Sequence, residues 1–137
     1  MSIRAALLAF FILLAPSQLW AKSRGLTVKQ GETWIFAISG GQPVRARQVQ
    51  ATEKPERGEV QVTVSAMMGT TMTITNNYPI SYTYRAELLG PGDKKAAPSR
   101  TCALPAKARI AIENWPQKAI AVRLSNFKPA PSGGSCP

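Results

Sequence analysis

Arginine is the residue type in this sequence most suited to binding chemistry. Five arginines stand at alternating positions within strand-like segments: Arg45, Arg47, Arg85, Arg109 and Arg123. Their apolar neighbours are expected to face a core, so the arginines should face outward. The guanidinium group is planar and suits phosphate, sulfate and carboxylate. The pattern predicts either an anion-binding sheet face or, as the simpler interpretation, a solvated surface that prevents strand edges from pairing with other chains.

Residues suited to catalysis are scarce. The sequence contains no histidine, which removes the commonest general base, the usual Ser-His-acid triad and most catalytic zinc sites. Glu53, Glu56 and Glu59 lie close together in a charged, turn-like segment. Lys54 and Arg57 are interleaved with them, so a solvated turn is expected rather than a carboxylate pair or a calcium site. With no phosphate-binding loop or nucleophile elbow, we expect no enzymatic activity, no metal site and no cofactor.

Two cysteines and one tryptophan complete the candidate residues. Cys102 and Cys136 predict one disulfide, since an even cysteine count in an exported chain usually forms bridges. The bridge would close a loop of about 35 residues, contributing roughly 3–4 kcal/mol, and would tie the C-terminal tail to the domain. A redox pair is the alternative, but no Cys-x-x-Cys spacing supports it. Trp115 precedes a proline, which suggests either an exposed aromatic contact or, as we prefer, a cap on one end of the fold.

The elements that must position these residues are predicted to be strands. Apolar and polar residues alternate through segment 60–89, which predicts three consecutive strands separated by turns near Gly69 and Pro79. Further strands are expected at 22–30, 32–39, 43–50, 108–114 and 119–127. The side chains expected to face inward are Trp34, Phe36, Ile38, Val44, Ala46, Val60, Val62, Val64, Met72, Ile74, Ile80, Tyr82, Tyr84, Ala86, Leu88, Ile110, Ile112, Ile120, Val122 and Leu124.

The strand pattern predicts an all-β fold. Seven or eight short strands, with turn signals every 8–12 residues, are typical of an immunoglobulin-like antiparallel β-sandwich. A small β-barrel is the alternative. Segment 90–107 is rich in proline and glycine and is expected to be a long loop. The Cys–Trp–Cys spacing of antibody domains is absent, so the pattern indicates an architecture and not a family.

The N-terminal residues have the pattern of an export signal. Arg4 precedes an apolar run at 5–15, and the small residue Ala21 suits cleavage, which predicts a signal peptide at 1–21. The run is about half of the roughly 20 residues that a membrane span needs, so the mature chain should have no transmembrane segment. A single β-sandwich domain at 22–127 and a Pro/Gly/Ser-rich tail at 128–137 would follow. Export places the protein in the periplasm or outside the cell.

The charge of the exported part bears on its partners. Without Arg4 the chain keeps 16 of its 17 basic residues against 7 acidic ones, a net charge of +9. We expect a non-enzymatic binding or accessory protein, foremost a protein-interaction module of the cell envelope. The alternative is an electrostatic binder of anionic lipid or glycan through the arginine-bearing face. Basic residues interleaved with aromatics can also bind single-stranded nucleic acid, but export argues against that partner.

Overall fold

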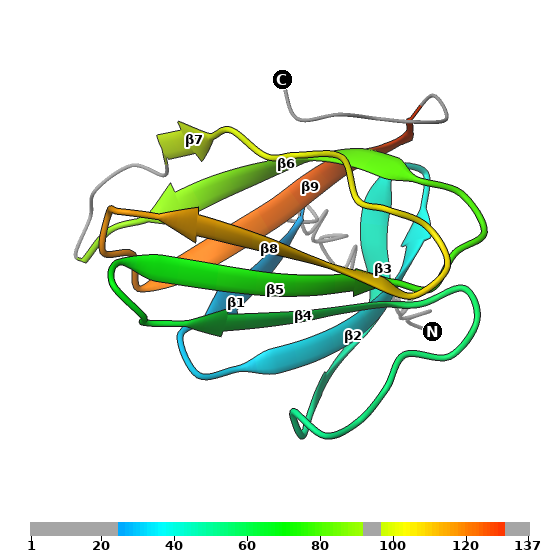
Figure 1. The fold of residues 1–137 in the computed structure, drawn as a ribbon, viewed down its shortest axis with the longest axis horizontal. Coiled ribbons are helices and arrows are strands. Elements are labelled where there is room, and N and C mark those ends of the chain that lie inside the picture. Colours follow the sequence, from blue (N-terminus) through cyan, green and yellow to red (C-terminus); the bar gives the residue numbers. More distant parts are fainter. Residues whose placement is uncertain (1–24, 92–96, 131–137) are drawn as a thin grey trace, which may run out of the picture.

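Two antiparallel sheets pack face to face as a sandwich in the computed structural model, which describes residues 25–91 and 97–130 (Figure 1). One sheet has the order β1 (Leu26–Lys29), β9 (Ala121–Pro129), β6 (Tyr82–Leu89) and β7 (Ala97–Ser99). The other has the order β3 (Gln42–Val49), β2 (Thr33–Ser39), β4 (Val60–Ser65), β5 (Thr70–Asn76) and β8 (Arg109–Trp115). The predicted β-sandwich is therefore confirmed. One strand more than expected forms, because β7 lies within the segment predicted to be a loop.

Some predictions fall outside the described residues. The expected signal peptide at 1–21 lies there, as does most of the tail, although β9 continues to Pro129. Cys136 also lies there, so its pairing with Cys102 stays a prediction. Within the part of the chain that the structure describes, no helix is long and apolar enough to span a membrane.

The core lies between the sheets and is built on the meander predicted from segment 60–89. Val60, Val62 and Val64 of β4 and Met72 and Ile74 of β5 are completely buried, as their alternation predicted. Each such side chain contributes roughly 1.5–3 kcal/mol when it leaves water. Aromatic rings contributed by both sheets meet in the same layer: Phe36, Tyr82, Tyr84 and Phe127.

A buried asparagine holds the connection from β5 to β6. The side chain of Asn76 accepts a hydrogen bond from the Tyr78 backbone nitrogen at 3.0 Å and donates one to the Ile80 carbonyl oxygen at 2.9 Å. Local bonds of this kind are why asparagine favours turns. Ile80 belongs to this turn and is partly exposed, so its predicted inward position is wrong and β6 begins at Tyr82.

The side of β8 that faces the core was predicted wrongly. Ile110 and Ile112 were expected inward, yet they are 64% and 67% exposed. Trp115 occupies the core side with only 7% of its surface exposed. Because side chains alternate, burying Trp115 places Ala111 and Glu113 on the inner face and turns both isoleucines outward. Trp115 therefore caps the sandwich, as preferred, and its interpretation as an exposed contact is wrong.

Two further segments depart from strict alternation. The register between β2 and β3 shifts between Ile35 and Ala37, where β3 carries one residue more than β2, and Ala46 of β3 is exposed, so its predicted inward position is wrong. Such a bulge inserts a residue and changes which face the following side chains occupy. Ile120 precedes β9 and is 51% exposed, so its predicted inward position is also wrong.

Candidate functional site

The outer side of the five-stranded sheet carries a face without charged side chains. The registers of β4, β5 and β8 align their outward residues in rows, for example Thr63 beside Thr73 and Thr73 beside Ile112. We call the outward residues of these strands the uncharged face: Gln61, Thr63, Ser65, Thr71, Thr73, Thr75, Ile110, Ile112 and Asn114. In a chain in which 18% of residues are charged, a charge-free area over three adjacent strands is a distinctive feature.

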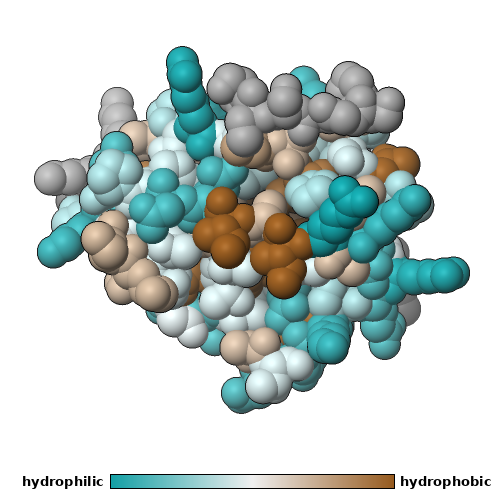
Figure 2. Space-filling model, in the orientation of Figure 1, coloured by the Kyte–Doolittle hydropathy of each residue, from teal (hydrophilic) through white to brown (hydrophobic). Residues whose placement is uncertain are grey.

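The two isoleucines of β8 give this face its apolar part. Figure 2 shows hydrophobic surface in the middle of the side formed by β8 and β5, surrounded by polar side chains. Ile112 lies opposite Thr73 and Ile110 opposite Thr75, so threonine side chains border both isoleucines. A single exposed apolar residue on a protein is ordinary, but neighbouring ones on a flat sheet face are typical of a contact surface.

A hollow of about 720 Å³ adjoins the uncharged face. Its lining includes loop residues 51–55 between β3 and β4, as well as Gln61, Thr75 and Ile110. Two side chains hold the loop: Gln61 donates to the Glu53 carbonyl oxygen at 2.6 Å, and Asn77 donates to the Pro55 carbonyl oxygen at 3.0 Å. An inserted side chain would therefore meet Ile110 on one side and loop backbone on another.

The end of β8 that carries Trp115 is firmly positioned. The indole nitrogen of Trp115 donates to the Arg100 carbonyl oxygen at 3.3 Å, and Asn114 donates to the Thr71 hydroxyl at 2.7 Å. Glu113 accepts a hydrogen bond from the Cys102 backbone nitrogen at 2.7 Å. These contacts fix the orientation of β8, so that its isoleucines point outward.

Two of the predicted arginines share the outer face of the four-stranded sheet. Arg123 forms a paired hydrogen bond with the carboxylate of Glu87 at 3.2 and 3.0 Å, and Arg85 lies 3.8 Å from the same carboxylate. The hydrogen bond from Arg123, with the charge of Arg85, lowers the pKa of Glu87. Glu87 thus compensates one of the two positive charges.

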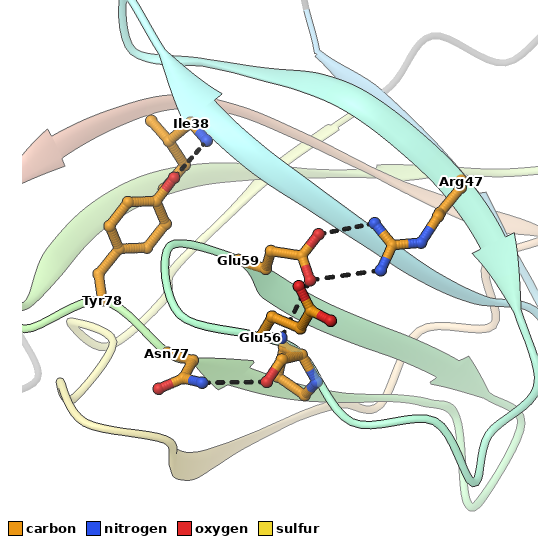
Figure 3. Close-up of polar contacts among 7 residues, drawn as sticks. Ile38, Arg47, Glu56, Glu59, Asn77 and Tyr78 are labelled. Carbon is orange, nitrogen blue, oxygen red and sulfur yellow. Dashed lines mark hydrogen bonds and ion pairs between the residues drawn. The ribbon is translucent and has the colours of Figure 1, made fainter.

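The other three predicted arginines lie on the five-stranded sheet, at its opposite edges. Arg45 and Arg47 belong to β3 and Arg109 belongs to β8. Arg47 donates to both oxygens of Glu59, at 2.6 and 3.3 Å, which lowers the pKa of Glu59 (Figure 3). The fold therefore does not gather the five arginines on one face, because their strands belong to two sheets and to opposite edges.

A second hollow, of about 470 Å³, lies at one end of the sandwich. Arg57 and Lys107 belong to its lining, together with Asn77 and Tyr78, and no described lining residue is acidic. Tyr78 also fastens this end, since its hydroxyl accepts a hydrogen bond from the Ile38 backbone nitrogen at 2.8 Å (Figure 3). Sequence reasoning missed this pair of cations, which are 50 residues apart in the chain.

The site was only partly visible in the sequence. Alternation within the segment 108–114 indicated that Ile110 and Ile112 share a face, but not that the face is exposed. No family model, curated protein or solved structure matches the chain. The fold and the site therefore define an all-β sandwich with an uncharged, partly apolar outer face.

Proposed function

We propose that this chain is an exported, non-enzymatic protein-interaction module of the cell envelope that binds its partner through the uncharged face. The exposure of Ile110 and Ile112 along the β8 side of that face is the observation that supports the proposal. The central part of a protein–protein interface is depleted of charge and enriched in apolar contact, and this face has both properties.

The occupant that suits this face is an apolar segment of another exported protein. The isoleucines supply apolar area, the threonine and asparagine side chains supply hydrogen bonds at the border, and the 720 Å³ hollow beside Ile110 accepts a protruding side chain. The contact at the isoleucines involves no charged side chain, and Glu53 and Lys54 are the charged residues that line the hollow, so most of the binding should persist at high ionic strength.

Capture from envelope extract tests the proposal. Wild-type protein should retain a defined protein through a high-salt wash, and the Ile110→Lys/Ile112→Lys variant should lose at least about 90% of it, since lysine would introduce charge into the apolar centre. Ile120→Lys is the matched control, because Ile120 is also an exposed isoleucine but lies outside the uncharged face. Equal capture by all three proteins would refute the proposal.

A second candidate is an electrostatic binder of anionic lipid or glycan. The hollow containing Arg57 and Lys107, without an acidic lining residue, is the observation that favours it. This function requires binding to anionic vesicles that weakens steeply with salt and is lost in Arg57→Gln/Lys107→Gln. Arg47→Gln is the control, because its charge is already compensated by Glu59.

We also propose that the sandwich is immunoglobulin-like. Two antiparallel sheets of short strands, with connections that pass from one sheet to the other, support this finer class. An experimental structure whose strand connectivity lacks a Greek key would contradict it.

A further inference from the structure

The edge of β8 is open and regular. Its pairing with β5 continues without interruption from Arg109, opposite Asn76, to Trp115, opposite Thr70. On its other side, β8 has no hydrogen-bonded neighbouring strand among residues 25–91 and 97–130. An unpaired edge offers backbone donors and acceptors to another strand, and proteins usually protect it with proline, a bulge or outward charges. Neither a proline nor a bulge interrupts β8, and its two charged residues, Arg109 and Glu113, have opposite signs.

The sequence of β8 is complementary to itself. We propose that the edge of β8 binds β8 of a second copy of this chain, antiparallel, about a two-fold axis at Ala111. In this register Arg109 lies opposite the partner's Glu113, and Ile110 lies opposite the partner's Ile112. Opposite charges and β-branched apolar pairs are the cross-strand combinations that stabilise antiparallel pairing. A two-fold axis repeats each favourable pair.

The neighbouring symmetric register is much poorer. A two-fold axis at Ile112 would place Arg109 opposite the partner's Trp115 and Ile110 opposite the partner's Asn114. Glu113 would then lie opposite the partner's Ala111, without a cation. The charges of β8 thus favour the axis at Ala111 over the axis at Ile112.

Both charged residues needed for this contact have groups that are available to bind the partner. Arg109 is exposed and forms no ion pair with any described residue, unlike Arg47 and Arg123. Glu113 uses one carboxylate oxygen for the Cys102 nitrogen, and the other oxygen has no hydrogen bond within the described part of the chain. Positive φ angles at Lys107 and Ala108 turn the chain before Arg109, and Pro116 follows Trp115, so pairing is confined to a short segment.

The inference goes beyond the proposed function, because it concerns strand pairing along the edge of β8, to which the outer-face residues Ile110 and Ile112 contribute only as cross-strand neighbours. Joining two copies would extend the sheet from five to ten strands. Ile110 and Ile112 of both copies would then form one continuous apolar area on the outer side. An extended partner would bind across the two-fold axis.

Charge exchange tests the pairing. Sedimentation of purified wild-type protein should show a monomer–dimer equilibrium at micromolar concentration. Arg109→Glu alone and Glu113→Arg alone should each weaken the dimer at least about tenfold, because like charges would face each other. An equal mixture of the two variants should form a heterodimer of wild-type affinity. Arg45→Glu, the same charge change on β3, should leave the dimer unchanged.

A cross-link gives a test that does not depend on Glu113. At the two-fold axis the Cα atoms of Ala111 and the partner's Ala111 would lie about 4.5–5.5 Å apart, within the range that a disulfide spans. Ala111→Cys should therefore form covalent dimers under mild oxidation, and Ala46→Cys on β3 should not. Monomeric wild-type protein at all concentrations, or folded charge variants whose mixture stays monomeric, would overturn the inference. Partner capture through Ile110 and Ile112 would remain a separate result, because Arg109 and Glu113 are not part of the uncharged face.

Discussion

The five-stranded sheet ends in two strands of opposite character, β3 and β8. The register of β3 is interrupted, Arg45 has a φ of 50°, and Pro43 removes one backbone donor. Arg47 of this strand forms an ion pair with Glu59, which directly precedes β4. Along β8 the register is continuous, and its two outward isoleucines are exposed.

This difference distinguishes the two edges of the sheet. The bulge, the proline and the arginines are features of β3 that prevent a further strand from pairing with it. Because the same sheet protects one edge and leaves the other regular, the open state of β8 is a local feature of the fold. Three properties of these strands can be measured: how firmly β8 is attached, how β3 depends on charge, and which face β8 buries.

The largest effect is expected from Gly69→Ala, at the turn where β5 begins beside the end of β8. A Cβ atom there would meet the Trp115 carbonyl oxygen and lie 2.9 Å from the Pro116 carbonyl carbon, and Gly69 has a φ of 112°. We expect a loss of about 3 kcal/mol or more in the free energy of unfolding, measured with urea. Gly40→Ala in the β2–β3 turn, where a Cβ has open space, should cost only about 1–2 kcal/mol. Equal losses would show that β8 is not packed more closely than β3.

A smaller loss is expected from Thr70→Val. The buried hydroxyl of Thr70 donates to the Gln117 carbonyl oxygen at 2.8 Å and accepts from the Ala119 nitrogen at 2.9 Å. Valine would leave both groups unpaired, which should lower the free energy of unfolding by about 2 kcal/mol. Thr73→Val on the uncharged face should change it by less than about 0.5 kcal/mol. If denaturant curves of the two variants coincide, Thr70 does not anchor the connection after β8.

Acid should weaken the ion pair that joins β3 to the start of β4. The hydrogen bond from Arg47 lowers the pKa of Glu59 in the folded state below its ordinary value of 4.5. The stabilisation is therefore complete above that value and is lost as the pH falls through the lower, folded pKa. Glu59→Gln should melt below wild type at neutral pH, and the difference should shrink towards pH 3. A pH-independent difference in melting temperature would contradict this account.

The smallest stability change is expected from Ile112→Thr. Since Ile112 is largely exposed, the free energy of unfolding should change by less than about 0.5 kcal/mol. Ile74→Thr, on the buried side of neighbouring β5, should cost several times more because it removes completely buried apolar surface and buries a hydroxyl. If thermal unfolding shows that both variants lose similar stability, then Ile112 is buried and β8 turns its isoleucines toward the core.

Prediction from the sequence succeeded best where strands follow each other in a meander. Residues Val60, Val64, Met72 and Tyr84 have the faces that alternation indicated. Short turns join these strands, so each partner is adjacent in the sequence and the apolar rows align without other information. The bulge in β3 was not predictable, because it depends on how this strand pairs with β2.

Prediction was weaker for strands whose partners are distant in the sequence. The register of β8 with β5 depends on contacts across about 40 residues, including Asn114 with Thr71. All five arginines are at least partly exposed, yet Arg109 belongs to the same side of β8 as Ala111 and Glu113, so its predicted outward face is wrong. The distribution of the arginines over two sheets depends on strand order, which no local pattern contains.

The sequence by itself determined the all-β composition, the positions of most strands and the core of the meander, because side-chain alternation and turn residues act locally. Only the tertiary structure decided that Ile110 and Ile112 face outward and that β8 forms an edge. A period of two is unchanged when a strand turns over, so the face of β8 was chosen by packing. The burial of Trp115 against the end of the sandwich required the isoleucines to face solvent.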